Sequence, residues 1–321
     1  MTTRRVLVTG AAGFVGSHLI ALLRNERPTP DVVGWRRPGP DRKPRRAAPD
    51  TPPQLPSMEV DILDAGAVGR AVEDLQPEQV YHCAGAAAVA GSWNDRVSTL
   101  RTNVMGTEHL LAAIARAAPS ARILVPGSAF VYRPGRGALA ENAGIGPLSP
   151  YGLSKLAQEM LAARYAADGL GVVRTRSFTH IGPGQDPSYA ASSFARQIAV
   201  IEAGRSEPAI QVGDLNARRD LLDVRDTVRA YRALMDHGAA GAVYNVCSGA
   251  AHPMREVLDG LVSLTGVPIE VRVDPARLRP SDYPVLCGDR TRITADAGWE
   301  PRIPLSETLR DLLDYWRATV D

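Results

Sequence analysis

The chain has 321 residues, of which 45% are hydrophobic and 22% are charged, and its formal net charge is +2. This composition is typical of a folded globular protein and excludes a disordered chain. So small a net charge gives no electrostatic reason to expect a nucleic-acid or membrane partner. No apolar run approaches the roughly 18 residues of a membrane span, and no signal peptide precedes the first apolar segment, so we expect a cytoplasmic protein.

Three cysteines, Cys83, Cys247 and Cys287, lie far apart in the chain. Their spacing matches neither a metal site nor a redox motif. A cysteine without such a partner behaves as a small hydrophobic residue, so we expect buried, reduced thiols and no metal.

The run Arg5–Thr9 is short, apolar and β-branched, which predicts a buried parallel strand. Three glycines follow it in a GxxGxxG spacing, and a helical stretch from Ser17 to Asn25 comes next. Gly10 permits a tight turn, Gly13 lets a pyrophosphate approach the backbone, and Gly16 lets the helix pack closely on the strand. The N-terminus of the helix would also present free N–H groups to phosphates. The segment therefore predicts a dinucleotide site.

The second predicted strand, 31–35, is followed by Arg36 and Arg37. Folds that prefer NAD usually carry an acid here, which accepts a hydrogen bond from the ribose 2′-hydroxyl. Guanidinium groups bind phosphate instead, so the pair favours NADP(H), although NAD(H) remains possible and the two arginines could simply be solvated. Residues 38–57 are rich in proline and arginine and predict a long surface loop.

Further strands are predicted to end near Asp61-Ile62, over 80–85, and over 122–125. Asp61 could accept from an adenine amino group, and the small residues Ala84 and Gly85 would let a cofactor pass closely. His82 is expected to be a packed strand residue, and a helix over 99–117 carries Asn103. Strands that alternate with helices in this way predict an α/β fold with a Rossmann-type, doubly wound parallel sheet.

Lys155 is one of only two lysines among 37 basic residues, the second being Lys43. It follows Tyr151 by four residues, and positions i and i+4 share one face of a helix. A compact ammonium can stabilise a phenolate and still reach a cofactor hydroxyl, whereas a guanidinium is bulkier and effectively never loses its proton. The pair indicates a proton-transfer site, to which Ser128 adds a hydroxyl at the end of a strand.

Taken together, GxxGxxG near residue 10, a serine after the fifth strand and a downstream YxxxK resemble the extended short-chain dehydrogenases/reductases. Within them, the chain is similar to the GDP-mannose branch of nucleotide-sugar enzymes, first to its 4-keto-6-deoxy-mannose reductases and second to its 4,6-dehydratases. The similarity covers nearly the whole chain apart from 38–57. It rests on five further segments: Ser92-Trp93, Asn103–Thr107, Thr179–Gln185, Gly213–Asp220 and Arg279–Asp282.

The resemblance implies a role for many individual residues. The implied catalytic residues are Ser128, Tyr151 and Lys155. The implied cofactor contacts are Gly10, Gly13, Phe14, Val15, Gly16, Arg36, Arg37, Asp61, Ile62, Ala84, Gly85, Asn103, Tyr151, Lys155 and His180. The implied substrate contacts are Ala88, Ser128, Thr179, Arg196, Arg219, Arg279 and Asp282.

The resemblance also implies an NADP-binding Rossmann domain at 1–177, to which 219–249 returns. A smaller C-terminal lobe, at 178–218 and 250–321, would bind the nucleotide sugar. Helices near 99–117 and 151–168 would pair in a homodimer.

Several departures from the family pattern bear on the reaction. Relatives carry an acid after the catalytic Ser or Thr, whereas this chain has Ala129 and Phe130. Dehydration needs a carboxylate base at the sugar C5 and an acid that expels the C6 hydroxyl, and neither residue can serve. Thr179 stands where relatives have Asn, and Ala87-Ala88 stands where they have Ser-Ser.

The missing acids argue against dehydration, whereas Thr179 and Ala87-Ala88 lie at positions that face the substrate in the family. The resemblance then implies reduction of the C4 ketone of a GDP-linked 4-keto-6-deoxyhexose by NADPH, with GDP-D-rhamnose as the product. A nucleotide-sugar 4-epimerase would use the same Ser, Tyr and Lys but retain its cofactor through the cycle. The chain could also be a GDP-mannose 4,6-dehydratase or a non-enzymatic sensor of NADP or sugar nucleotides.

Overall fold

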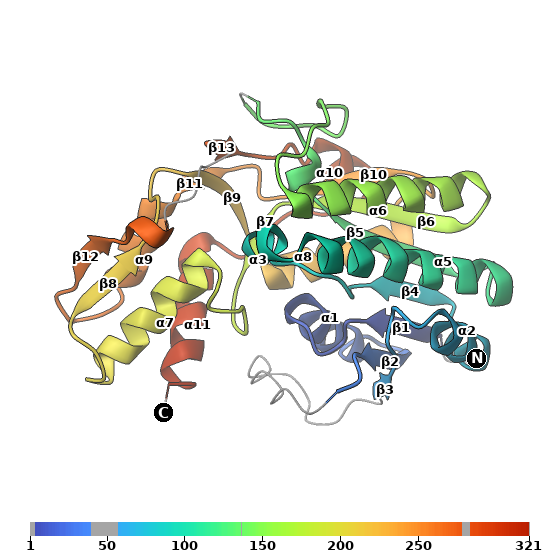
Figure 1. The fold of residues 1–321 in the computed structure, drawn as a ribbon, viewed down its shortest axis with the longest axis horizontal. Helices are drawn as coiled ribbons and strands as arrows, with labels where there is room; N and C mark the ends of the chain where they lie inside the picture. Colours follow the sequence, from blue (N-terminus) through green and yellow to red (C-terminus); the bar gives the residue numbers. More distant parts are fainter. Residues whose placement is uncertain (1–3, 40–56, 136, 278–282, 321) are drawn as a thin grey trace.

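A computed structural model describes residues 4–39, 57–135, 137–277 and 283–320. Its centre is a seven-stranded sheet of order β10-β6-β5-β4-β1-β2-β3, in which every ladder is parallel (Figure 1). This confirms the predicted doubly wound sheet. The strands are β1 (Arg5–Thr9), β2 (Asp31–Arg36), β3 (Ser57–Glu59), β4 (Gln79–His82), β5 (Arg122–Ser128), β6 (Gly171–Ser177) and β10 (Val243–Val246).

Helices cover both faces of this sheet, because side chains along each strand alternate between two buried faces. Val6 and Val8 of β1 pack into one core with α1 (Phe14–Arg24), α8 (Val224–His237) and α10 (Thr291–Ala297). Leu7, between them, packs into a second core. The helices on that second side are α2 (Ala65–Leu75), α5 (Gly106–Ala117) and α6 (Pro150–Ala167).

A second lobe lies beyond the end of the large sheet (Figure 1). Its core is formed mainly by α7 (Ala190–Glu202), α9 (Met254–Val262) and α11 (Leu305–Arg317). Two small sheets complete it, β8 with β12 and a group in which β9 pairs with β7, β11 and β13. These strands are β7 (Thr179–Ile181), β8 (Ala209–Val212), β9 (Arg218–Asp223), β11 (Ala251–Pro253), β12 (Glu270–Val273) and β13 (Val285–Leu286).

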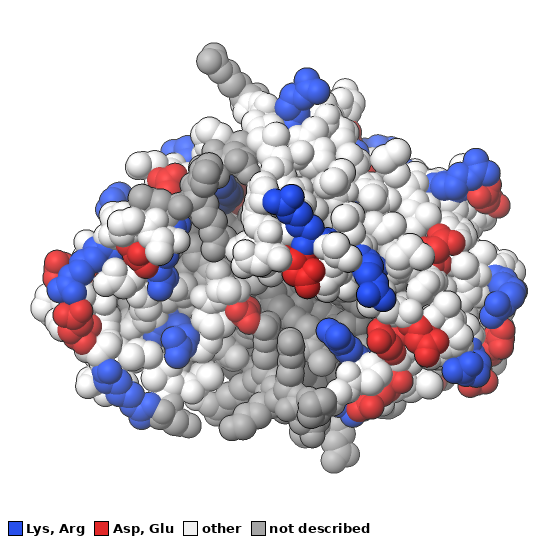
Figure 2. Space-filling model, viewed as in Figure 1, with Lys and Arg blue, Asp and Glu red and all other residues white. Residues whose placement is uncertain are grey.

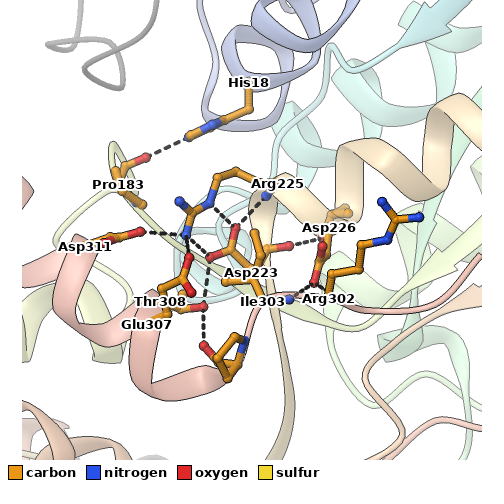
Figure 3. Close-up of polar contacts among 12 residues, drawn as sticks. His18, Pro183, Asp223, Arg225, Asp226, Arg302, Ile303, Glu307, Thr308 and Asp311 are labelled. Carbon is orange, nitrogen blue, oxygen red and sulfur yellow. Dashed lines mark hydrogen bonds and ion pairs between the residues drawn. The ribbon is translucent and has the colours of Figure 1, made fainter.

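The N-terminal end of α8 ties the lobes together (Figure 3). Asp223, the N-cap of α8, accepts a hydrogen bond from Thr308 of α11 at 2.8 Å and pairs with Arg225, which also reaches Asp311 of α11 at 2.7 Å. On α1, His18 donates from its Nε2 to the carbonyl of Pro183 at 2.9 Å. The two lobes are therefore joined by buried polar contacts as well as by the chain itself.

The structure corrects several sequence-based expectations. The helix expected over 99–117 is divided into α4 (Arg96–Leu100), a π-helical turn at Arg101–Met105, and α5. The first helix begins at Phe14 rather than Ser17, and β3 ends at Glu59, two residues before Asp61. Of the three cysteines, all of them free, only Cys247 is buried, whereas Cys83 and Cys287 are half-buried.

Two elements do not lie in the lobe to which the predicted domain boundaries assign them. β9 pairs within the second lobe, although 219–249 was expected to return to the large sheet. α10, inside the segment assigned to the smaller lobe, packs against α8 and β10. With these two elements moved, the division into two lobes remains our proposal.

The surface carries both signs of charge. Figure 2 shows basic and acidic side chains scattered over one face of the molecule rather than gathered in a single large patch. This distribution agrees with the net charge of +2. Within the described ranges, no helix is long and apolar enough to cross a membrane.

Candidate active site

The first turn of α6 brings Tyr151 to the carboxyl end of β5. The helix starts with Pro150 at its first position and with Ser149 as N-cap, whose hydroxyl accepts a hydrogen bond from the Gly152 amide at 3.0 Å. A side chain at Gly152 would overlap the carbonyl oxygen of Phe130, in the 3₁₀ turn Ala129–Val131. Glycine therefore allows the helix to approach the turn that follows Ser128.

Tyr151 and Ser128 share a hydrogen bond in this arrangement. The Tyr151 amide donates to Ser92 Oγ at 3.1 Å, and Ser92 lies in α3 (Val89–Asn94). Burial raises the pKa of Tyr151, and the bond to Ser128 opposes that rise. Since burial is the larger effect, the phenol keeps its proton at neutral pH and is poised to donate it.

Phe130 follows Ser128 by two residues and packs on the aromatic rings of the site. Its ring meets that of Tyr151 edge-on, with centroids 6.1 Å apart, and that of Tyr283 at 5.3 Å. Glu141, in the following loop, uses its Oε1 to accept from the Asn245 amide at 2.7 Å. Its carboxylate therefore stabilises the backbone at the end of β10.

Lys155 is nearly buried, one helical turn after Tyr151. Its ammonium donates to the Pro126 carbonyl at 2.6 Å and to Gln158 Oε1. Burial lowers the pKa of Lys155 to about 8, although Cys83 and Glu159 favour the charged form. The ammonium can thus lose its proton within an ordinary laboratory pH range.

The glycine-rich segment fits a dinucleotide pyrophosphate. Gly10 has a φ of 67°, and a Cβ on it would lie 2.7 Å from the Ala84 nitrogen, so both its conformation and the close approach of the segment after β4 require glycine. α1 begins after the N-cap Gly13 without a capping side chain. Its first N–H groups, including those of Phe14 and Val15, are therefore left for an anion.

Asn103 lies fully buried in the π-helical turn and joins two parts of the site. Its Oδ1 accepts from the Ala86 amide at 2.8 Å, while its Nδ2 donates to Ser154 of α6 at 2.8 Å. A Cβ on Gly85 would lie 3.0 Å from the same Oδ1. Asn103 therefore positions the backbone beside the predicted cofactor site, and its direct contact with a cofactor stays a prediction.

The residues predicted to recognise the adenosine half lie at the ends of β2 and β3. Arg36 is half-buried and pairs with Glu59 on the neighbouring strand at 2.7 Å, whereas Arg37 is exposed. Asp61 accepts from the Leu63 amide at 3.0 Å, and the Ile62 carbonyl accepts from His109 at 3.0 Å. Arg37 therefore has the more accessible guanidinium for a 2′-phosphate.

β7 brings part of the second lobe against the glycine-rich segment. The His180 ring stacks on Phe14 with centroids 5.9 Å apart, and burial lowers the pKa of His180. Thr179, in the same short strand, lies opposite Leu221 of β9. These contacts place residues of both lobes around one site, as a bridging substrate requires.

The predicted substrate residues are less closely grouped. Ala88 is the N-cap of α3, beside Ala87, whose carbonyl accepts from the Tyr189 hydroxyl at 3.0 Å. Arg219 donates to the Tyr283 carbonyl at 2.6 Å. Arg196 lies over the Trp316 ring, 5.9 Å from its centroid. Two further predicted contacts, Arg279 and Asp282, lie outside the described residues.

Three residues near this site escaped the sequence analysis. Ser92 was noticed only as part of a motif, and its bond to the start of α6 depends on a contact between distant segments. Gln158 and Tyr189 gave no signal in spacing or composition.

Within the described ranges, no group of three or more His, Cys, Asp and Glu side chains could hold a metal ion.

Comparisons with known proteins identify the family to which the chain is similar. The family model described as GDP-mannose 4,6 dehydratase matches residues 7–312. GDP-6-deoxy-D-mannose reductase of Pseudomonas aeruginosa is 36% identical over 328 residues, which cover 99% of each chain.

Solved structures of related enzymes superpose along the whole chain. The structure of RMD from Pseudomonas aeruginosa complexed with NADPH has a TM-score of 0.83 and 33% identity, covering 99% of this chain and 100% of that one. UDP-glucose 4-epimerase of Thermus thermophilus in complex with NAD has a TM-score of 0.85 and 27% identity, covering 98% and 99%. The chain therefore belongs to the GDP-mannose 4,6-dehydratase family, among the NAD(P)-dependent nucleotide-sugar enzymes of the extended short-chain dehydrogenase/reductase type.

Proposed function

We propose that this enzyme reduces the C4 ketone of a GDP-linked 4-keto-6-deoxyhexose with NADPH, converting GDP-4-keto-6-deoxy-D-mannose to GDP-D-rhamnose. The observation that carries the proposal is the segment after Ser128. It keeps the hydroxyl pair of Ser128 and Tyr151 that carbonyl reduction needs, but it places Ala129 and Phe130 where dehydration needs acids. The similarity to GDP-6-deoxy-D-mannose reductase supports the same substrate class.

Each side chain of the site would have its own role in the reduction. NADPH, when bound, supplies the hydride for the carbonyl carbon. Tyr151 gives its hydroxyl proton to the C4 oxygen of the sugar, and Ser128 donates a hydrogen bond to the same oxygen. The Lys155 ammonium, one helical turn away, stabilises the phenolate that remains. Residues from both lobes enclose the sugar and limit the access of water.

The proposed cofactor contacts follow the glycine-rich segment and the ends of the strands. The first turn of α1 would hold the pyrophosphate, Arg37 the 2′-phosphate, and Asp61 the adenine. Arg219 would bind the diphosphate of the sugar nucleotide. Arg196, which lies over the ring of Trp316, is the weaker candidate for this role.

The proposal is tested by NADPH absorbance with GDP-4-keto-6-deoxy-D-mannose, made by a separate dehydratase that is removed before the assay. We expect rapid NADPH oxidation matched by one GDP-deoxyhexose product, whose configuration at C4 is read by NMR. An enzyme that binds NADPH but leaves this ketone unreduced would overturn the proposal.

A 4-epimerase is the second candidate, favoured by the similarity to UDP-glucose 4-epimerase with NAD. An epimerase retains its cofactor through the cycle, so it would purify with about one tightly bound nucleotide and would interconvert 4-epimeric sugar nucleotides without net NADPH oxidation. Incubation with GDP-mannose alone serves as the control for dehydratase activity, which we expect to be absent.

Tyr151→Phe tests the proposed proton donor. The substitution removes only the hydroxyl, so the ring can still pack against Phe130 and cofactor binding should be unchanged. Because positioned proton transfer typically contributes about 10²–10⁴-fold to rate, we expect kcat to fall by about that factor. Turnover is measured by NADPH oxidation and binding by NADPH fluorescence. A variant with near-normal kcat would remove Tyr151 from the mechanism.

We further propose that the enzyme is a homodimer. Large apolar side chains are exposed along α4, the π-helical turn and α6, which we call the apolar helix face, and α6 packs against both of the other elements. Exposed apolar groups gathered on one side of a molecule mark an association surface. The apolar helix face comprises Val97, Leu100, Met105, Leu153 and Met160.

A further inference from the structure

A chain of buried polar side chains runs behind the active site, from Lys155 to the segment that follows β4. Its middle members are Gln158 of α6, Thr107 of α5 and His82 of β4, none more than 2% exposed. Thr9, at the end of β1, completes the chain. Buried polar groups need hydrogen-bond partners, so the partners of each group can be traced.

The contact with Lys155 shows which way the Gln158 amide is oriented. An ammonium can only donate, so Gln158 must present its Oε1 to Lys155 and its Nε2 to the other side. There, Nε2 donates to Thr107 Oγ1 at 2.7 Å. The single hydroxyl proton of Thr107 is donated to the Asn103 carbonyl at 2.7 Å. The reverse amide orientation would set N–H groups against the ammonium.

The same reasoning fixes the tautomer of His82. Because the Thr107 proton is already used, the 2.9 Å contact between His82 Nε2 and Thr107 Oγ1 requires a proton on Nε2. Nδ1 must then accept from Thr9 Oγ1, also at 2.9 Å, and Thr9 Oγ1 accepts from the Ala84 amide at 3.1 Å. Burial, with a smaller effect from Lys155, lowers the pKa of His82 to about 3, so the ring stays neutral. The hydroxyl protons of Thr9 and Thr107 and the ring N–H of His82 thus have one acceptor each.

We propose that Gln158 is a positioning residue for Lys155, with its amide oriented by Thr107 and His82, and that it holds the ammonium in place while favouring its charged form. The inference rests on the proposed function, because it concerns the lysine assigned to the proton-transfer step. Gln158 and the Pro126 carbonyl take two of the three N–H groups of the ammonium. The third can then be donated to the phenol or to a cofactor hydroxyl.

Several titratable groups face the Lys155 ammonium. Cys83, after β4, and Glu159, on α6, both favour the charged form. Glu159 is itself held in a buried ion pair by Arg176 of β6, at 2.7 Å. His82 is neutral, and the phenol of Tyr151 keeps its proton, since burial raises its pKa. Gln158 contacts the ammonium directly without carrying a charge, so its replacement isolates the contribution of one hydrogen bond.

The chain offers an unusually direct test, because it contains only two lysines. In protein labelled with ¹³Cε-lysine, the NMR spectrum holds two lysine signals, and Lys43→Arg identifies the one from Lys155. Its chemical shift is followed from pH 6 to pH 11. Loss of the acceptor in Gln158→Leu disfavours the ammonium and should lower the pKa of Lys155 by about one to two units. Gln158→Glu places a negative charge beside the ammonium and should raise that pKa.

Two controls separate this role from general effects on folding. Gln197→Leu removes a half-buried amide on α7 that also bridges two groups, and it should leave the Lys155 signal in place. Thr107→Val keeps Gln158 but removes the hydroxyl that orients it, so it should move the pKa of Lys155 in the same direction as Gln158→Leu. This variant also serves if Gln158→Leu does not fold.

An unchanged pKa of Lys155 in folded Gln158→Leu and Gln158→Glu would overturn the inference. The NMR measurement needs no substrate, so its outcome is independent of whether the proposed reduction is the natural reaction. In the reductase assay, the alkaline limb of kcat/KM should move in the same direction as the pKa of Lys155. A parallel loss of rate at every pH would indicate a purely structural role for Gln158.

Discussion

Burial acts in opposite directions on the two ionisable groups of the proposed proton-transfer step. It raises the pKa of the Tyr151 phenol and lowers the pKa of the Lys155 ammonium to about 8. In both cases the neutral form gains, because a charge is less stable away from water. The neutral phenol is the form that donates a proton, whereas the neutral amine can no longer stabilise the phenolate.

The pH dependence of the reduction should therefore be limited on its alkaline side by Lys155. The lowered pKa means that the ammonium is present below about pH 8 and is lost as the pH rises through that value. We expect kcat/KM, which reports groups of the free enzyme, to fall about tenfold per pH unit above about pH 8. The check is a profile of initial rates from pH 6 to pH 10. A flat profile up to pH 10 would contradict this assignment.

Arg37 should determine the preference between the two nicotinamide cofactors. Arg36 is already paired with Glu59, whereas Arg37 is exposed and can bind a 2′-phosphate. A hydrogen bond to a charged group contributes about 1.5–3 kcal/mol, so Arg37→Ala should raise the KM for NADPH by at least about tenfold and leave that for NADH nearly unchanged. Glu59→Gln, which removes the carboxylate charge beside Arg36, should lower the KM for NADPH. Equal changes in the KM for NADPH and in the KM for NADH would show that neither arginine binds the 2′-phosphate.

At the scale of elements, the approach of α6 to the turn after β5 sets the distance between Tyr151 and Ser128. Gly152→Ala would place a methyl group on the Phe130 carbonyl and force the helix outward. We expect a loss of about 1–3 kcal/mol in the free energy of unfolding and a fall in kcat larger than the rise in KM. Unfolding in urea and steady-state kinetics measure the two effects.

Gly144→Ala is the matched control for this substitution, because no atom lies within 4 Å of a Cβ built there. It should leave stability and kinetics close to those of the unmodified enzyme. If Gly152→Ala behaved in the same way, the close approach of α6 would not be what positions the tyrosine.

The elements differ in how well the sequence predicts them. β1 was predicted to the residue, because a buried parallel strand is a short apolar run bounded by glycine. The break before α5 was missed, because the capping of α4 by Asp95 and the π-helical turn interrupt a continuous helical pattern. The pairing of β9 with β7 was also missed, because it joins strands far apart in the chain.

The residues of the candidate site also differ in how well the sequence predicts them. The glycines and the Tyr-Lys pair lie in local patterns with a fixed spacing, and spacing can be read from one sequence. Gln158 has no such pattern. Its partners come from α5 and α6, and its orientation follows from hydrogen bonds that extend to β1, so only the folded chain reveals it.

At the scale of the whole molecule, the site is divided between the two lobes. The stack of His180 on Phe14 and the bond from His18 to Pro183 both join α1 to the segment 180–183. The ion pair of Arg225 with Asp311 joins α8 to α11 on the same side (Figure 3). These contacts hold the second lobe against the proposed cofactor site.

Association through the apolar helix face is the remaining prediction at this scale. Met160 and Leu153 are 65% and 52% exposed on α6, and they are seven residues apart, which places them on the same side of the helix. An unpaired charge in such a contact is costly, so Met160→Glu combined with Leu153→Glu should convert a dimer to a monomer. Light scattering coupled to size-exclusion chromatography measures the mass, and 34.3 kDa is the mass of one chain.

Val273→Glu, on the exposed strand β12 of the second lobe, is the control that should remain dimeric. A double variant with the unchanged mass of a dimer would move the interface elsewhere, and an unmodified enzyme of 34.3 kDa would exclude the dimer itself.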